Sequence, residues 1–232
     1  MKEEASLKIL RKVFHPDKWF GVTYDVVNYR EKDNDIVVYT NSPLLLRKEL
    51  SELSYKPFIS LGSTCDPYFG VEREYELTRK CLEVINEFSL PCVVITKHDL
   101  ILKDLNVLKE INKTKKAWVV FYLNSYDKGL IQAIDVINNE NIKTGVILDS
   151  ELINAIDPKL LKRLTEDVKK AGGKFLLPMQ LLDNDYYKTE VNLDPLKLEK
   201  LYEWCEEIDL SVKMPMYEDE LIQTRQINLF EI

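Results

Sequence analysis

The stretch Ile59–Asp104, ISLGSTCDPYFGVEREYELTRKCLEVINEFSLPCVVITKHDLILKD, decides the fold of this chain. Two short apolar runs in or beside it, 58–63 and 92–97, are typical of strands that are covered on both faces. The segment between them has apolar residues every three or four positions, which indicates a helix. A strand, a helix and a second strand in this order predict a right-handed crossover between two parallel strands.

The same alternation continues outward along the chain. Asp157 followed by Pro158 marks the start of one later helix, because an aspartate cap and a proline in the first turn are common there. Six strand–helix units are too few for a closed eight-stranded barrel. The sequence therefore predicts the α/β class, as a partial (β/α)6 TIM-barrel-like curved parallel sheet or a doubly wound sheet, with outer helices and a short C-terminal extension. The other predicted strands are 35–40, 117–124, 144–149 and 174–179, and the predicted helices are 42–53, 72–88, 104–113, 128–141, 157–173 and 194–208.

We expect a single domain over 1–232, because no long Gly/Pro/Ser linker and no low-complexity tract interrupts the pattern. Within it we predict an N-terminal helical lead-in at 1–20, and a C-terminal helix with a docking tail at 190–232. The first residues, MKEEASLKILRKVF, are charged and amphipathic and lack the apolar core of a signal peptide. No apolar run approaches the roughly 20 residues that cross a bilayer. We therefore expect a cytoplasmic protein without a membrane partner.

Charge and residue counts restrict the partners and metals that the chain can hold. The net charge of −7 argues against a broad phosphate-binding surface, because such surfaces need clustered lysine and arginine. With only His15 and His98 in the chain, a histidine-based zinc centre is not expected. The cysteines are Cys65, Cys81, Cys92 and Cys205. They form no CxxC or CxxxCxxC pattern, so no metal site and no disulfide framework is predicted.

Polar residues follow the strands in the stretch that opens this section, and they form the candidate site. In α/β folds the loops after the carboxyl ends of the strands build the ligand site, so these side chains are expected to converge. A purely structural role is the alternative, because Asp-Pro is a common turn element and Thr78 or Asp104 can cap helices. The candidate residues are Ser63, Thr64, Asp66, Tyr68, Glu72, Arg79, Thr96, Lys97 and Asp104.

The same residues carry a resemblance to a known family. The segment is similar to the spore-photoproduct-lyase-like branch of the radical S-adenosylmethionine (SAM) enzymes, whose members resemble GS-x-x-DPY-x-x-x-E followed by LTR-x-x-LE. A second motif of that branch resembles TKS-x-LI-x-RD, and here His98 replaces its serine and Lys103 its arginine. The matching residues are Gly62, Ser63, Asp66, Pro67, Tyr68, Glu72, Leu77, Thr78, Arg79, Leu82, Glu83, Pro91, Thr96, Lys97, Leu100, Ile101 and Asp104.

The resemblance implies a partial barrel and a [4Fe–4S] cluster that chelates SAM, held by the three cysteines of a CxxxCxxC loop. That loop is missing: VVNYR at 26–30 runs directly into EKDNDIVVYT at 31–40, and residues 1–64 contain no cysteine. Other side chains rarely replace three thiolates at once. We therefore expect a degenerate member with no cofactor. Lys97 matches a lysine that contacts SAM in the family, so weak residual SAM binding is expected at most.

Three functional hypotheses follow from the retained motifs and the missing loop. The first is a non-catalytic radical-SAM-like pseudoenzyme that acts as a binding or regulatory protein, with a protein partner such as an active radical SAM relative. The second is a cluster-independent enzyme that acts on a nucleotide or another anionic small molecule, with Asp66, Glu72 and Lys97 as its acid–base residues. The third is a nucleic-acid-associated protein related to spore photoproduct lyase, which the negative net charge disfavours.

Overall fold

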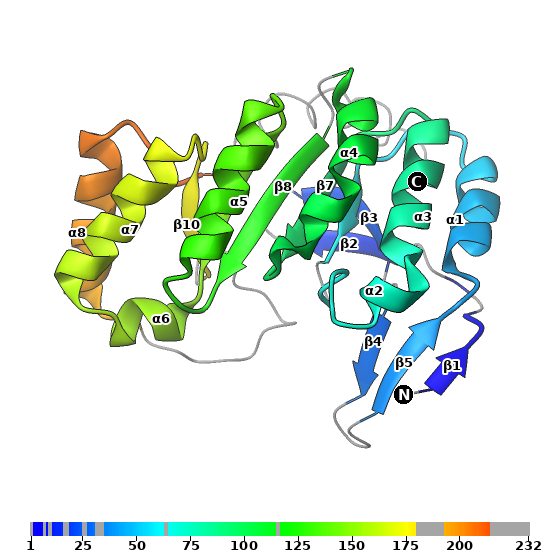
Figure 1. Ribbon diagram of the computed structural model, residues 1–232, viewed down its shortest axis with the longest axis horizontal. Coiled ribbons are helices and arrows are strands. Elements are labelled where there is room, and N and C mark those ends of the chain that lie inside the picture. Colours follow the sequence, from blue (N-terminus) through cyan, green and yellow to red (C-terminus); the bar gives the residue numbers. More distant parts are fainter. Residues whose placement is uncertain are drawn as a thin grey trace. The chain divides into compact units, whose positions relative to one another are not determined.

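The computed structural model of the chain describes residues 2–6, 8, 11–15, 19–24, 27–30, 35–62, 65–114, 117–179 and 193–213. The chain divides into two compact units. The first contains 1–13 and 20–119, and the second contains 14–19 and 120–232. Each unit is built from strands followed by helices (Figure 1). Within the described residues, no helix combines the length and the apolar character that crossing a membrane requires.

A small sheet in the first unit contains the two strands on either side of residues 31–34. Its strands are β1 (Lys2–Glu4), β5 (Asp35–Tyr39) and β4 (Val27–Arg30), in the order β1-β5-β4. β4 and β5 pair in antiparallel register, while β1 is parallel to β5. The strand predicted at 35–40 is therefore present, but it pairs in this small sheet and not in the parallel sheet of strand–helix units.

The N-terminal prediction is wrong. In place of the helical lead-in at 1–20, the structure has β1, β2 (Arg11–His15) and the start of β3 (Trp19–Tyr24). The amphipathic pattern of this segment favoured a helix, but local propensity is a weak preference. Backbone pairing of Lys2 with Val37 and of Glu4 with Tyr39 places this segment in the small sheet, whereas a short helix gains little stability without tertiary packing.

The parallel strands of the first unit hold the residues that the sequence selected. Here the order is β7 (Cys92–Thr96), β6 (Ile59–Leu61), β3 and β2, with β3 and β7 both parallel to β6. The side chains of β6 are all buried, and those of β7 nearly all. This burial on both faces explains their continuous apolar sequences.

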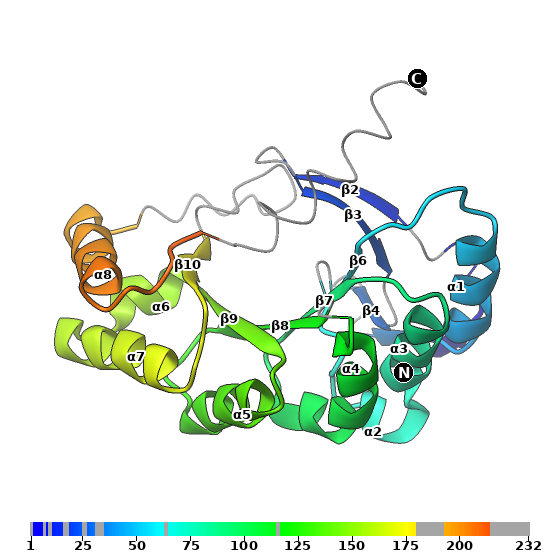
Figure 2. The same cartoon turned by 90° about the horizontal axis from the view of Figure 1, so that it is seen from above.

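Three helices cover this part of the sheet. They are α1 (Ser42–Ser51), α3 (Leu77–Glu87) and α4 (Leu105–Asn112). α1 packs against α3, and α3 packs against α4. Figure 2 shows α3 and α4 on the same side of β6 and β7. Because α3 follows β6 and α4 follows β7 in the chain, the segments that connect them start at the carboxyl ends of these two strands.

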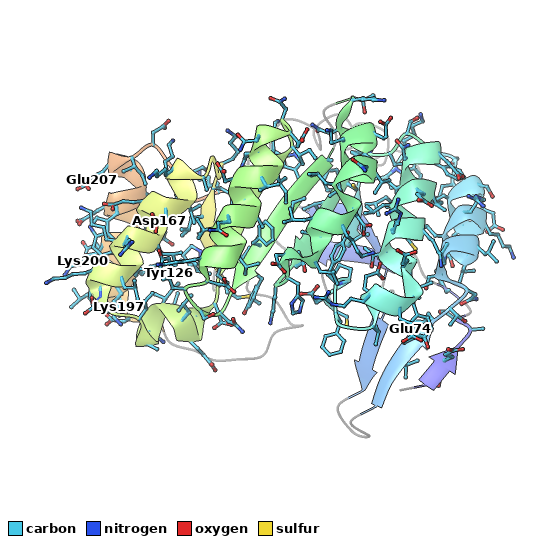
Figure 3. All side chains as sticks on the ribbon, in the orientation of Figure 1. Glu74, Tyr126, Asp167, Lys197, Lys200 and Glu207 are labelled. Atoms are coloured by element: carbon cyan, nitrogen blue, oxygen red, sulfur yellow. The ribbon has the colours of Figure 1, made fainter. Side chains whose placement is uncertain are left out.

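The second unit repeats the pattern. β8 (Ala117–Leu123) begins in the first unit and continues into the second, where the order is β10 (Leu176–Pro178), β9 (Lys143–Leu148) and β8. The Tyr126 hydroxyl after β8 donates a hydrogen bond to Asp167 (Figure 3). The helices of this unit are α5 (Lys128–Asn139), α6 (Ser150–Ala155), α7 (Pro158–Lys170) and α8 (Pro195–Glu207).

These elements confirm the predicted fold class, a parallel α/β sheet surrounded by helices. The structure places α8 within the C-terminal segment predicted at 190–232. The docking tail that follows lies outside the described residues beyond position 213. Each predicted strand and helix after β5 has a counterpart, with ends that differ by a few residues, but the helix predicted at 72–88 is divided into α2 (Glu72–Tyr75) and α3. Two further elements, the 3₁₀ helix η1 (Asp99–Asp104) and α6, were not predicted.

Gly62 is the backbone position on which the β6 turn depends. Its φ is +90°, and a Cβ added there would lie 2.0 Å from the Ile95 carbonyl oxygen. We expect Gly62→Ala to lower the free energy of unfolding by about 1 to 3 kcal/mol, because both the left-handed backbone and the close approach disfavour a side chain. Urea denaturation followed by circular dichroism measures the effect. Gly70→Ala is the matched control, since a Cβ there meets nothing within 4 Å; equal losses in the two variants would contradict the expectation.

Candidate functional site

Seven of the nine predicted site residues lie in the described part of the chain, all in the first unit. Ser63 and Thr64 lie outside the described residues. The other seven come from the loop after β6, from the two helices that follow it, and from the end of β7 and the segment after it. They form two connected groups of contacts, one centred on Asp66 and one on the pair Glu72 and Asp104.

Asp66 joins the loop after β6 to the turn after β7. Its Oδ1 accepts hydrogen bonds from the Thr96 hydroxyl at 2.7 Å and from the Tyr68 backbone N–H at 2.9 Å. Its Oδ2 accepts from the Lys97 backbone N–H at 2.6 Å. Thr96 is buried, and its hydroxyl oxygen accepts from the His98 backbone N–H at 3.1 Å. One carboxylate therefore fixes the backbone of the Thr96–His98 turn.

The side chains of this turn lie at the surface. Lys97 and His98 are both exposed, and His98 Nε2 lies 3.9 Å from Asp66 Oδ2. We call Asp66, Thr96, Lys97 and His98 the binding edge. Its two inner residues hold the backbone, and its two outer residues present a cationic and a titratable side chain to solvent.

Glu72 is buried, and its carboxylate caps the first turn of α3. It opens α2 (Glu72–Tyr75), a single turn that ends where Glu76 adopts a φ of 51° and α3 begins. Its carboxylate accepts from the backbone N–H groups of Thr78 at 2.9 Å and Arg79 at 3.4 Å. These are among the N–H groups that a helix leaves unpaired in its first turn, where a negative charge is favourable.

Thr78 and Asp104 were the residues for which capping was the alternative. The Thr78 hydroxyl donates to the Pro67 carbonyl at 2.6 Å, so it ties α3 back to the loop after β6. Asp104 occupies the N-cap position of α4 but makes no capping hydrogen bond with its side chain. Both residues have structural partners, although not those that capping predicts.

Asp104 accepts several donors in a buried position. It ends the 3₁₀ helix η1 (Asp99–Asp104) and is 1% exposed. The Tyr68 hydroxyl donates to Asp104 Oδ2 at 2.9 Å, and Arg79 Nη1 lies 3.7 Å from Asp104 Oδ1. Lys103 Nζ lies 3.3 Å from Asp104 Oδ2 and 3.0 Å from Glu72 Oε1.

Lys103 is not among the nine candidate residues, although it lies at the centre of their contacts. Its ammonium links the two buried carboxylates, and it lies 6.0 Å from the centre of the Tyr68 ring. Its neighbour Asp104, on the same 3₁₀ helix, was selected, whereas Lys103 was noted only as the replacement of the arginine in the second motif. The signal was present in the sequence, because Lys103 directly precedes Asp104 in the second motif.

Burial is the main cause of the pKa shifts of Asp104 and Tyr68. Removal from water raises the pKa of Asp104 above its usual value, and the nearby Lys103, Tyr68 and Arg79 oppose that rise. Burial, followed by the neighbouring Asp104, raises the pKa of Tyr68 well above its usual value. Tyr68 therefore remains a protonated hydrogen-bond donor over the whole pH range in which proteins are normally studied.

The donor atoms of this chain do not fit an iron–sulfur cluster held by three thiolates. Cys81, Cys92 and Cys205 are buried in three different elements. Burial raises the pKa of Cys92 and of Cys205 to about 12, which disfavours the thiolates that bind iron. Cys65 remains near the binding edge as a single thiol. In the described part of the chain, no three His, Cys, Asp or Glu residues are grouped in a way that could hold a metal ion.

No family model matches the chain. An uncharacterized protein of Methanocaldococcus jannaschii is 26% identical over 126 residues, which are 54% of this chain and 43% of that protein. An uncharacterized protein of Mycobacterium tuberculosis is 32% identical over 79 residues, which are 34% of this chain and 23% of that protein. The matched part of the chain thus spans less than half the length of either relative.

Solved structures give a longer match. A mutant of spore photoproduct lyase with bound AdoMet and dinucleoside spore photoproduct superposes with a TM-score of 0.60 over 89% of this chain and 78% of that one, at 14% identity. Spore photoproduct lyase complexed with the dinucleoside spore photoproduct gives a TM-score of 0.57 over the same shares, at 13% identity. This likeness shows a fold like that of spore photoproduct lyase, in agreement with the predicted partial barrel.

The buried tyrosine provides a direct test of the site. We expect Tyr68→Phe to lower the free energy of unfolding by about 1 to 3 kcal/mol, because it removes a donor from a buried carboxylate. Tyr75→Phe is the matched control: its hydroxyl also donates to a carboxylate, that of Glu3 at 2.6 Å, but in an exposed position. Chemical denaturation of both variants measures the difference. A loss in Tyr75→Phe as large as that in Tyr68→Phe would show that burial does not set the cost.

Proposed function

We propose that this chain is a cytoplasmic binding or regulatory protein that uses a radical-SAM-like fold without radical chemistry. The observation that carries the proposal is the donor set: the cysteine loop is absent from the sequence, and three of the four cysteines are buried in separate elements. Reductive cleavage of SAM requires an iron site that these thiols cannot assemble. Degeneration of the cluster loop, with the strands and helices retained, is part of this proposal.

The state of the carboxylates supports binding over cluster-independent catalysis. Asp66 accepts three hydrogen bonds from the chain, and Glu72 accepts two backbone N–H groups and the Lys103 ammonium. A general acid or base needs a free position within hydrogen-bond reach of its substrate. Because the carboxylates of Asp66 and Glu72 are both engaged by structural partners, we rank the cluster-independent enzyme below the binding protein.

The binding edge suggests the class of ligand. Lys97 and His98 are exposed on a turn whose backbone Asp66 holds, so a bound anion would meet the Lys97 ammonium beside the His98 imidazole. The solved neighbours carry AdoMet and a dinucleoside in their names, which makes nucleotides and adenosyl compounds the first probes. A long nucleic acid is disfavoured by the net charge of −7. A protein partner, including an active radical SAM relative, is retained as a further candidate.

Anaerobic reconstitution tests the absence of cluster chemistry. We expect protein treated with iron and sulfide to retain far less than one [4Fe–4S] cluster per chain after desalting, because three thiolate ligands are lacking. Iron and sulfide analysis, with absorption and electron paramagnetic resonance spectra, measures the outcome. Cys65→Ser is the control, since any iron that it retains is bound without the thiol at the edge. A stoichiometric cluster with the [4Fe–4S] spectrum would overturn the proposal.

Titration of the binding edge tests where an anion is held. We expect AdoMet or ATP to bind the unmodified protein weakly, and Lys97→Ala to weaken that binding by about tenfold, because a charge-assisted contact is removed. Isothermal titration calorimetry measures both. Lys113→Ala is the matched control, because Lys113 is an exposed lysine on the same unit that pairs with Glu110. If the two substitutions weaken binding equally, or if neither does, then the binding edge does not hold the anion.

A further inference from the structure

One ammonium group in the first unit is shared by two buried carboxylates. Lys103 Nζ lies 3.0 Å from Glu72 Oε1 and 3.3 Å from Asp104 Oδ2, and both carboxylates are 1% exposed. Glu72 begins α2, whereas Asp104 ends η1, so the ammonium connects two elements that are separate in the sequence. The Lys103 side chain itself is 23% exposed.

Lys103 is the cation that contacts both carboxylates of this bridge. Arg79 contacts Asp104, but its guanidinium also pairs with Glu83 at 3.4 Å. Arg79 is 3.7 Å from Asp104 and its side chain is 41% exposed, so it is the weaker of the two cationic contacts. The uncharged titratable groups nearby are the hydroxyl of Tyr68 and, from β7, the thiol of Cys92. Without Lys103, Asp104 would keep the more distant Arg79 guanidinium, whereas Glu72 would lose its ammonium partner and keep the backbone N–H donors of Thr78 and Arg79.

The bridge is connected to the binding edge through the segment 66–72. Tyr68 donates its hydroxyl to Asp104 at 2.9 Å, and its backbone N–H donates to Asp66 at 2.9 Å. Glu72 anchors the other end of this segment at Lys103. Asp66 in turn accepts from the Thr96 hydroxyl and the Lys97 backbone N–H. A continuous series of hydrogen bonds and ion pairs therefore runs from Lys103 to the turn that presents Lys97.

We propose that Lys103 is the positioning residue of the binding edge. Its ammonium bridge between Glu72 and Asp104 holds the segment 66–72 against η1, and so sets the position of Asp66 and of the turn after β7. The positioning role itself stands on these contacts alone, while its effect on a ligand rests on the proposed function. A lysine that merely filled space would be replaceable by a neutral side chain of similar length, and this distinction can be measured.

Three substitutions separate charge from packing at this position. Lys103→Met keeps most of the aliphatic length and removes the charge. Lys103→Arg keeps the charge and offers additional donors that can reach both carboxylates. Lys103→Met combined with Asp104→Asn removes one charge of each sign, so it keeps the protein testable if the single methionine variant folds poorly. Lys113→Met is the control for losing a surface lysine of the same unit.

Hydrogen exchange of the backbone amides is the first measurement. In Lys103→Met we expect the peptides that cover 65–79 and 96–104 to exchange at least about tenfold faster than in the unmodified protein. The reason is that breaking a buried ion pair costs a free energy several times larger than RT. Lys103→Arg should restore protection, and the double variant should lie between. Unchanged exchange in Lys103→Met would overturn the proposal, as would a loss that Lys103→Arg fails to reverse.

The pH dependence of thermal unfolding is the second measurement. Lys103 lowers the pKa of Asp104, so removing it raises that pKa further above the value in the unfolded chain. The folded protein then binds the proton more tightly than the unfolded one, and stability falls as the pH rises through this range. We expect the thermal unfolding midpoint of Lys103→Met to fall more steeply with rising pH than that of the unmodified protein. If the unfolding midpoints of Lys103→Met and of the unmodified protein change with pH in the same way, the charge of Lys103 does not have this role.

A ligand readout distinguishes failure of this inference from failure of the proposed function. If AdoMet and ATP do not bind the unmodified protein while Lys103→Met loosens both peptides, the positioning role stands and the proposed anion site fails. If they bind and Lys103→Met leaves exchange unchanged, the site stands and the positioning role fails. If both hold, Lys103→Met should weaken binding about as much as Lys97→Ala, and Lys103→Arg should recover it.

Discussion

Two carboxylates buried around one ammonium are the constraint on which the first unit depends. A buried charge is tolerated only where partners replace the water that it loses. Glu72 finds them in the first turn of α3 and in Lys103, while Asp104 finds them in Tyr68 and Lys103. Because these partners come from separate elements, satisfying the two charges also fixes the loops that connect β6 with α3 and β7 with α4.

The strands of the parallel sheet could be predicted because burial on both faces leaves a direct trace in the sequence. Continuous apolar runs indicated β6, β7, β8, β9 and β10, and helix starts such as Asp157 followed by Pro158 were correct. The pattern shows that a strand is buried but not which strand it pairs with. For this reason 35–40 was assigned to the wrong sheet, and β1, whose pairing partner β5 lies far along the chain, was predicted as part of a helix.

The candidate site was predictable as a set of residues but not as a set of roles. Asp66, Tyr68, Glu72, Arg79, Thr96, Lys97 and Asp104 lie in one unit because the carboxyl ends of parallel strands share an edge. Whether a polar side chain faces solvent or the interior depends on partners distant in sequence. Tyr68 is buried by a contact with Asp104, 36 residues away, while Lys97 is exposed beside the buried Thr96. No local pattern distinguishes these two cases.

The helices of the second unit have a consequence for phosphate recognition. Each of α5, α6, α7 and α8 begins at an aspartate whose carboxylate accepts hydrogen bonds from the first backbone amides of its own helix; these are Asp127, Asp149, Asp157 and Asp194. Helix N-termini are common phosphate-binding positions because their amides are unpaired and the helix dipole is positive there. Here each of those four positions already carries a covalently attached anion. A phosphate group would have to displace an aspartate of the chain itself, so these helix ends select against such ligands.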